Sequence, residues 1–363
     1  MKVFHCDHCG HLLFFENTQC VKCGRLVAYL PDLALVGSLD RNDKSLADDT
    51  IATWRSPLET AGRVYRLCEN YAKESVCNWA VEASDPHTLC VSCRLTHVIP
   101  DLTTGEHRPA WYRLEAAKRR LIFTLLRLRL PIVSRTDDPA GGLAFEFKSD
   151  ALTGHATGVI TVNIAEADDA ERERRRTSLH EPYRTLVGHF RHEIGHYYWD
   201  RLIAGRDALE RFRASFGDEQ PDYGEALKTY YANGPTADWA ERYISAYASA
   251  HPLEDWAETW AHYLHMVDTL ETAAACGISL QPRRADEPSL TRVSPVVLFE
   301  DAPFDRLIDS WYPVTYVLNN LTRGMGVVDA YPFVWSAPAI EKLRFVHEIV
   351  SDPRNANTAE RLS

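Results

Sequence analysis

The sequence predicts an α+β fold in which cysteine-rich N-terminal modules precede a mostly helical domain with a small sheet. Eight of the nine cysteines lie within the first 93 residues, as in small modules stabilised by metal ions. Beyond them, a few strand-like segments alternate with longer stretches whose apolar residues recur every three or four positions, as in helices. We expect modules at residues 1–35 and 55–105, a main domain at 108–352 and a polar tail at 353–363.

The first four cysteines form two CxxC pairs, in the segments CDHCG and CVKCG. A glycine follows each pair and permits the tight turn that directs backbone N–H groups at the sulfur atoms. This spacing predicts a zinc ribbon in residues 1–35, with a redox pair or disulfides as the alternative. The expected ligands of this first structural zinc ion are Cys6, Cys9, Cys20 and Cys23.

The next four cysteines are spaced less regularly, since only CVSC is a CxxC pair. Four cysteines within 26 residues nevertheless predict a second structural zinc site. Two alternatives stay open: the ligands interleave between the two sets, or His5, His8 or His87 replaces a thiolate. The expected ligands of the second zinc ion are Cys68, Cys77, Cys90 and Cys93.

Charge argues against a nucleic-acid partner. The chain carries 40 Lys and Arg against 51 Asp and Glu, a net of −11, and its first 100 residues show no excess of basic residues that would neutralise phosphates. One basic segment, WYRLEAAKRRLIFTLLRLRLP, has a leucine stripe at helical spacing, so we interpret its charges as the solvated face of a helix. These charges are on Arg113, Lys118, Arg119, Arg120, Arg127 and Arg129.

Residues between the modules and after them are organised by turns and short strands. SLDRNDKSLADDT is polar and acidic, so we expect a linker or exposed loop there, and IPDLTTGEHRP marks the start of the main domain. LAFEFK and GVITVN alternate as strands do.

The sequence shows no N-terminal signal segment and no apolar run of about 18 residues. Zinc thiolates require a reducing compartment. We therefore expect a cytoplasmic protein without a membrane partner.

Residues 192–196 read HEIGH, the HExxH signature of zinc hydrolases. With 3.6 residues per turn, His192 and His196 project from one face of a helix and can share a zinc ion. Glu193 then lies beside the metal, where it can take a proton from a zinc-bound water. Leucine, valine and aromatic residues at three- and four-residue steps predict that this helix is buried.

A third ligand is expected in the downstream segment HPLEDWAETWAHYLH. We assign Glu254 as that ligand and Glu258 as the acceptor of the second ring N–H of a ligand histidine, an interaction that zinc-bound histidines usually make. The same helical stripe also carries Glu258, His262 and His265, any of which could replace Glu254.

This order of residues resembles the gluzincin metallopeptidases, in which a helix downstream of HExxH supplies a glutamate ligand and, one turn later, an orienting acid. It is most similar to catalytic domains of the lethal-factor type, which have a tyrosine seven residues before the ligand glutamate. The resemblance implies that Tyr247 donates a hydrogen bond to the oxyanion of the reaction. A packing residue in an alanine- and tyrosine-rich helix is the alternative.

Longer segments, such as EPYRTLVGHFRHEIGHYYWDRL and HPLEDWAETWAHYLHMVDTLETA, resemble the bacterial zinc-binding metallopeptidases that carry an N-terminal zinc ribbon. This resemblance implies a zincin-like domain, one catalytic and two structural zinc ions, and a polypeptide substrate cleaved at a peptide or isopeptide bond. The GVITVN strand, if it lies at a sheet edge, could receive that substrate; otherwise it is a core strand.

Two other functions remain open on the sequence alone. The chain could be a zinc-ribbon adaptor with a silent or partner-activated peptidase domain, or an amidase that acts on a small non-peptide amide. Oligomeric state is not encoded in these motifs. Three polar residues flank the HExxH segment or the Glu254 helix and could simply lie at helix ends: His189, Asp200 and His251.

Overall fold

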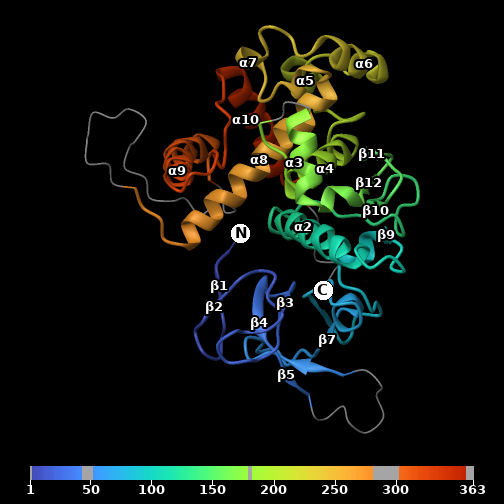
Figure 1. The fold of residues 1–363 in the computed structure, drawn as a ribbon, viewed down its shortest axis with the longest axis vertical. Helices are drawn as coiled ribbons and strands as arrows, with labels where there is room; N and C mark the ends of the chain where they lie inside the picture. The colour runs from blue at the N-terminus through green and yellow to red at the C-terminus, as the bar shows by residue number, and fades with distance from the viewer. Residues whose placement is uncertain (1, 43–51, 179–181, 281–301, 357–363) are drawn as a thin grey trace.

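The chain folds into two parts, a cysteine unit (residues 2–42 and 52–95) and a larger, mostly helical domain (Figure 1). The expected α+β fold is therefore confirmed. The computed structural model describes residues 2–42, 52–178, 182–280 and 302–356. Most of the expected linker at 38–50 and most of the polar tail at 353–363 lie outside these residues.

Short antiparallel strands build the cysteine unit. Strands β1 (Phe4–His5) and β2 (Leu12–Leu13) form one pair, and β3 (Val27–Leu30) and β4 (Leu35–Ser38) form another. A four-stranded sheet follows in the order β5 (Asp40–Arg41), β6 (Trp54–Arg55), β7 (Tyr65–Leu67) and β8 (Ala80–Glu82). The helix α1 (Glu69–Ala72) and the 3-10 turn η2 (Cys93–Leu95) complete the unit.

The two halves of the cysteine unit, each with one set of cysteines, share a core. The backbone N–H of Tyr29 donates to the carbonyl of Asn78 at 2.9 Å, and the hydroxyl of Tyr71 donates to the carbonyl of Val27 at 3.0 Å. The rings of Tyr29 and Trp79 lie 4.5 Å apart. The two expected modules therefore pack as one body.

A mixed sheet forms one wall of the helical domain. Its strand order is β11 (Gly154–Ala156), β12 (Val159–Asn163), β10 (Ala144–Lys148) and β9 (Thr96–Val98). β10 runs parallel to β9 and to β12, whereas β11 is antiparallel to β12. Strand β12 therefore has neighbours on both sides, so the interpretation of GVITVN as an edge strand is wrong and the core-strand alternative holds. The antiparallel edge strand is β11.

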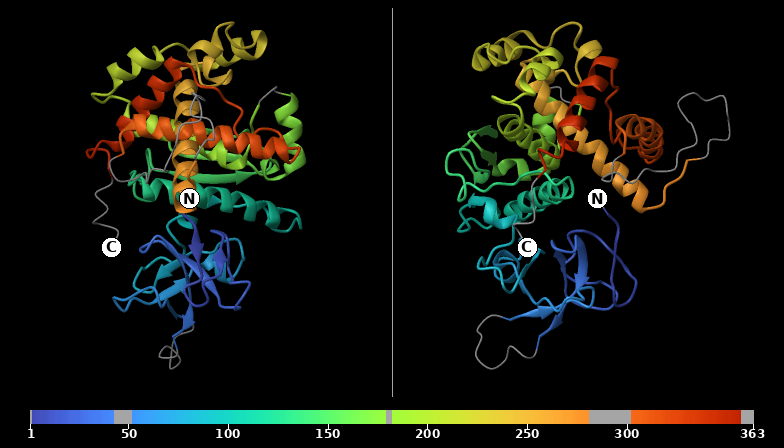
Figure 2. Two further views of the ribbon diagram at one scale, coloured as in Figure 1. Left: turned by 90° about the vertical axis from the view of Figure 1, so that its left-hand side faces the viewer. Right: turned by 180° about the vertical axis from the view of Figure 1, so that it is seen from behind.

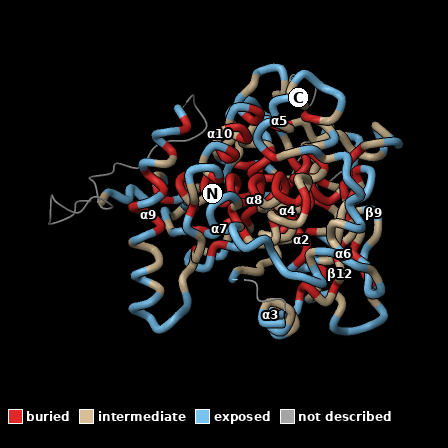
Figure 3. The backbone as a smooth tube through the Cα atoms, turned by 90° about the horizontal axis from the view of Figure 1, so that it is seen from above, coloured by how far each residue is buried: buried red, intermediate tan, exposed pale blue. Residues whose placement is uncertain are grey.

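Helices make up the rest of this domain, and the long helix α8 crosses its centre (Figures 1 and 2). Seen from above, α4 and α8 form the most buried part of the domain (Figure 3). The helices and 3-10 turns are α2 (His107–Arg127), η3 (Ile164–Ala167), α3 (Asp169–Ser178), α4 (Leu186–Leu202), α5 (Leu209–Phe216), α6 (Tyr223–Asn233), α7 (Trp239–Arg242), η4 (Tyr247–Ser249), α8 (Pro252–Ala275), α9 (Phe304–Gly324) and α10 (Ala337–Ser351).

Local sequence explains where α4 and α8 begin and how closely they approach. Thr185 caps α4 by accepting from the N–H of Gly188 at 3.0 Å. His251 caps α8, whose first residue is Pro252, a residue suited to the first turn. A Cβ atom at Gly195 would lie only 2.9 Å from the Cα of Ala257. The glycine inside HEIGH therefore permits the close packing of the two helices.

Helix α2 joins the two parts of the molecule. Its Phe123 ring packs 5.7 Å from Tyr29 of the cysteine unit. Lys118 and Arg119 are fully buried, so the prediction that all charges of this segment are solvated is wrong for these two. Lys118 pairs with the buried Glu115 at 2.9 Å, and Arg119 donates to the carbonyl of Val76. Helical periodicity alone did not reveal these tertiary partners.

Candidate metal centre

His192, His196 and Glu254 meet between α4 and α8. The Nε2 atoms of the two histidines lie 3.3 Å apart. Glu254 places Oε2 at 3.0 Å from Nε2 of His192 and Oε1 at 3.6 Å from Nε2 of His196. Ligands bound tetrahedrally to zinc at 2.0–2.1 Å are separated by about 3.4 Å. The spacing of these donors therefore fits one zinc ion.

The surroundings of Glu254 support the same assignment. Its side chain is fully buried, yet its Oε2 atom makes no hydrogen bond with the described residues. A buried carboxylate oxygen without a donor is costly unless a cation or proton satisfies it. The residue therefore suits a metal ligand better than a packing role.

Glu258 lies where the sequence predicted an orienting acid. Its Oε1 atom is 2.7 Å from Nδ1 of His192, and Ser245 donates to its Oε2 at 2.6 Å. The carboxylate keeps a proton on Nδ1 of His192, which leaves the Nε2 lone pair directed at the cluster. Glu258 therefore orients a ligand in this arrangement.

The histidines weighed as alternative ligands contact other residues. Nδ1 of His262 pairs with the hydroxyl of Tyr331. Nδ1 of His265 lies 2.6 Å from Nη1 of Arg191. Neither histidine belongs to the cluster of potential ligand atoms among the described residues.

Glu193 is buried beside this cluster. Burial raises the pKa of its carboxyl to about 7; His192 opposes the shift, and Glu254 and Glu258 reinforce it. A carboxylate with such a pKa can accept and return a proton near neutral pH. Its position and its pKa both suit a general base.

Two tyrosines also reach the centre. The ring of Tyr247 lies 6.0 Å from that of His192, and burial raises the pKa of its phenol. Tyr223 at the start of α6 donates a hydrogen bond to Oε1 of Glu254. Tyr223 could not be predicted from the sequence, because it precedes Glu254 by 31 residues in a separate helix and no spacing rule connects them.

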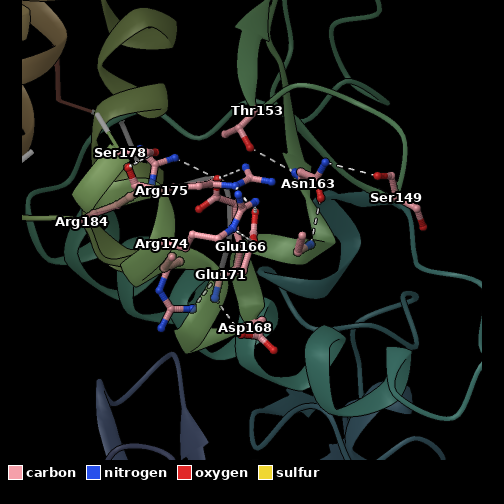
Figure 4. A network of polar contacts seen from close by, with 12 residues as sticks. Ser149, Thr153, Asn163, Glu166, Asp168, Glu171, Arg174, Arg175, Ser178 and Arg184 are labelled. Carbon is pink, nitrogen blue, oxygen red and sulfur yellow. Dashed lines mark hydrogen bonds and ion pairs between the residues drawn. The ribbon is translucent and has the colours of Figure 1, made fainter. Parts of the chain in front are cut away.

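A polar network holds the segment that leads into α4 (Figure 4). The buried Glu166 accepts from Arg175 at 2.8 Å and from Arg184 at 2.9 Å. Its other oxygen lies 3.4 Å from Nδ1 of His189, one turn before His192. Among the three flanking residues, His189 therefore joins this network and His251 caps α8, whereas Asp200 lies 4.0 Å from His155.

The edge strand β11 runs next to α4. Its His155 ring stacks on that of His196, with ring centroids 6.1 Å apart and planes inclined by 12°. Burial lowers the pKa of His155 to about 4, so the ring is neutral near pH 7. Strand β11, which pairs only with β12 among the described strands, therefore lies close to the candidate metal ligands.

The eight N-terminal cysteines form two separate four-sulfur clusters. Sulfur atoms lie 3.8 Å apart in Cys6–Cys23, 3.6 Å in Cys9–Cys20 and 3.8 Å in Cys77–Cys90. Zinc bound to thiolates at 2.3 Å separates its ligands by about 3.8 Å, whereas a disulfide is about 2.05 Å long. Both clusters could hold structural zinc.

The membership of the clusters also decides between the alternatives. The first contains Cys6, Cys9, Cys20 and Cys23, and the second Cys68, Cys77, Cys90 and Cys93. The sets do not interleave, and within the described residues neither cluster includes His5, His8 or His87. Arg119 of α2 lies near the second cluster and interacts electrostatically with Cys77, Cys90 and Cys93.

Comparison with known proteins gives a consistent result. A family model described as "Putative zinc-binding metallo-peptidase" matches residues 107–349, and one described as "zinc-ribbon domain" matches residues 3–104. Uncharacterized proteins of Mycobacterium bovis and of two strains of Mycobacterium tuberculosis are each 43% identical over 358 residues, which is 97% of this chain and 96% of theirs. No solved structure matches the chain. None of the helices described is long and apolar enough to span a membrane.

Proposed function

Because the chain belongs to the family of putative zinc-binding metallo-peptidases, we propose that it hydrolyses a peptide or isopeptide bond with the help of zinc. One observation carries this proposal: the donor atoms of His192, His196 and Glu254 have the mutual distances of tetrahedral zinc ligands. Glu193 lies directly beside them. Three protein donors would leave the fourth position of a tetrahedral zinc ion for water, which supports a catalytic role.

Each residue of the centre has a distinct task in this proposal. A zinc ion held by His192, His196 and Glu254 would polarise the scissile carbonyl and lower the pKa of water. Glu193 accepts a proton from the attacking water and returns it to the departing amine. Tyr247 donates a hydrogen bond to the oxyanion, a contribution worth roughly 3 kcal/mol where one such donor is removed.

The substrate class follows from strand β11. A polypeptide in extended conformation can add to this edge as a further strand, through main-chain hydrogen bonds that do not depend on its sequence. Because β11 lies beside α4, the added strand would pass the metal ligands. We therefore propose a polypeptide substrate rather than a small amide, and a structural role for the two zinc ions held by cysteines.

Replacement of Glu193 tests the proposal. Glu193→Gln should lower the cleavage of a broad peptide library, followed by mass spectrometry, by about a thousandfold, because the general base is lost. Zinc per chain should not change. Glu210→Gln, at an exposed position on α5, is the matched control and should cleave like the parent. Equal cleavage by Glu193→Gln and the parent would refute the mechanism, and no cleavage by any of the three would favour the adaptor.

A further inference from the structure

A cavity of about 580 Å³ lies where the cysteine unit meets the helical domain. Its walls come from Glu16 of the cysteine unit, from α2, from the segment before α4, and from α4 and α8. On α8, its residue His265 follows Glu254 by eleven positions, a distance of about 16 Å along the helix. The cavity is therefore separate from the candidate metal centre.

His265 lines this cavity, and its ring carries one hydrogen-bond donor. An arginine can only donate, so the 2.6 Å contact from Nη1 of Arg191 makes Nδ1 of His265 an acceptor. Burial holds the pKa of this imidazole well below its usual value, so the ring is neutral and its one proton is on Nε2. The residue is 9% exposed, and none of the described carboxylates or carbonyls accepts from Nε2. The ring of Tyr183, which also lines the cavity, lies 5.3 Å away at 88°.

The acidic groups of the cavity are already satisfied. Glu16 pairs with Arg120. Asp268 accepts from Arg191 and, at 2.9 Å, from the hydroxyl of Thr124. Neither acid is therefore left to accept from His265.

Arg113 adds a positive charge that no described carboxylate neutralises. It lines the cavity from α2 and is exposed to solvent, and it has no ion-pair or hydrogen-bond partner among the described residues. The three lining arginines exceed the two lining acids by one charge, although the chain as a whole is acidic. An anionic ligand would supply an acceptor for the donors of His265 and Arg113.

We propose that this cavity is a binding site for a carboxylate ligand, with Nε2–H of His265 and the guanidinium of Arg113 as its donors. A carboxylate can accept from an imidazole N–H and from a guanidinium, and its two oxygen atoms suit the forked geometry of arginine. The volume is in the range of sites for small organic ligands, so the carboxylate can belong to a free dicarboxylic acid or to the C-terminus of a peptide. This inference does not depend on the proposed hydrolysis.

Titration of the full-length protein labelled with ¹⁵N-histidine tests the site. The probes are acetyl-Ala-Ala with a free carboxylate, the same peptide as its amide, and glutarate. The Nε2 signal of His265, assigned by its loss in His265→Gln, should shift with at least one carboxylate probe but not with the amide. Tighter binding of the peptide would identify a chain terminus as the source of the carboxylate, and tighter binding of glutarate a free acid.

Two arginine variants complete the test. Arg113→Gln should weaken the binding of the carboxylate probe about tenfold, because a charged hydrogen bond is lost. Arg129→Gln, an exposed arginine that does not line the cavity, should bind like the parent. The proposal is overturned if no probe moves the His265 signal at about 10 mM, a concentration that detects even weak sites. An equal response to the amide, or equal weakening in both variants, would also overturn it.

Discussion

The buried four-cysteine cluster and the histidine–glutamate centre offer a metal ion different numbers of protein atoms. Cys68, Cys77, Cys90 and Cys93 are all buried and supply four sulfur atoms. The centre between α4 and α8 supplies three donors from residues that are partly exposed at His192 and His196. Four protein ligands close a zinc site, whereas three leave room for water and substrate. The four-cysteine cluster therefore suits a structural zinc ion, whereas the three-donor centre suits a zinc ion that also binds water or substrate.

The second difference lies in the charges around each set of ligands. The buried Arg119 interacts with the thiolates of the second cysteine cluster, the closed cluster of Cys68, Cys77, Cys90 and Cys93. The open centre has instead two carboxylates and a phenol next to its ligands, from Glu193, Glu258 and Tyr223. A nearby cation stabilises thiolates, while neighbouring carboxylates can orient a ligand and carry protons.

Loss of a thiolate should have the largest effect on stability. We expect Cys77→Ser to lose one zinc ion per chain and to lower the melting temperature of the whole molecule by about 10 °C or more, because structural zinc contributes several kcal/mol to folding. Cys9→Ser is the matched comparison. Its cluster is partly exposed, whereas the second cluster is buried and interacts with Arg119 of α2. The helical domain of Cys9→Ser should therefore melt within about 3 °C of the parent. Calorimetry measures the melting temperature and elemental analysis the zinc per chain. An equal decrease of the melting temperature in the two variants would contradict the expected difference between the clusters.

Removal of a donor from the open centre should affect metal content but not the fold. Glu254→Gln keeps the size of the side chain and removes its charge, so we expect zinc per chain to fall from about three to about two with a small change in melting temperature. Asp222→Asn, at the cap of α6, is the control and should keep all three ions. A parent with two zinc ions, unchanged by Glu254→Gln, would contradict the third site.

Arg119 should have an intermediate effect on the closed cluster. In Arg119→Met the thiolates lose a buried cation that interacts with three of them. A chelating dye should therefore extract the zinc ion of the second cysteine cluster about tenfold faster. Arg120→Met, on the same helix but paired with Glu16, controls for the loss of an arginine and should release zinc at the parental rate. The same rate in both variants would mean that Arg119 acts only through packing.

The smallest effect is expected at Tyr223. Tyr223→Phe removes the hydrogen bond to Oε1 of Glu254, and one such bond is worth about 1 kcal/mol. Competition with a chelator should therefore show about fivefold weaker zinc binding at the open centre and no change at the cysteine clusters. Tyr231→Phe, on the same helix, is the control. Unchanged zinc affinity in Tyr223→Phe would show that this phenol does not support the ligand.

Local spacing in the sequence was enough to predict the groups that meet within one helix or one turn. His192 and His196 are brought together by helical geometry, and the CxxC pairs by tight turns. Glu254 and Glu258 were predicted from a second helix, and its contact with the first depends on Gly195, whose role became visible only through its 2.9 Å approach to Ala257.

Features that depend on tertiary partners could not be predicted in this way. The alternation of residues 159–164 indicates a strand but not its neighbours, so the sequence left open whether this strand lies at the edge or in the core of the sheet. Arg119 occupies a helical position typical of a solvated charge, and only the carbonyl of Val76 and the nearby thiolates explain its burial. Tyr223 reaches Glu254 across a loop, a contact that no periodicity encodes.

Strand β9 limits where this protein can be divided. It comprises Thr96–Val98, ahead of α2, yet it pairs with β10 of the helical domain. A chain that began at residue 107 would leave one side of β10 without its neighbour, and exposed strand edges of this kind pair with other chains. The metallopeptidase region would then aggregate although every metal ligand of its own centre was present. The segment ahead of α2 therefore belongs to the sheet of the helical domain, and a working fragment has to include it.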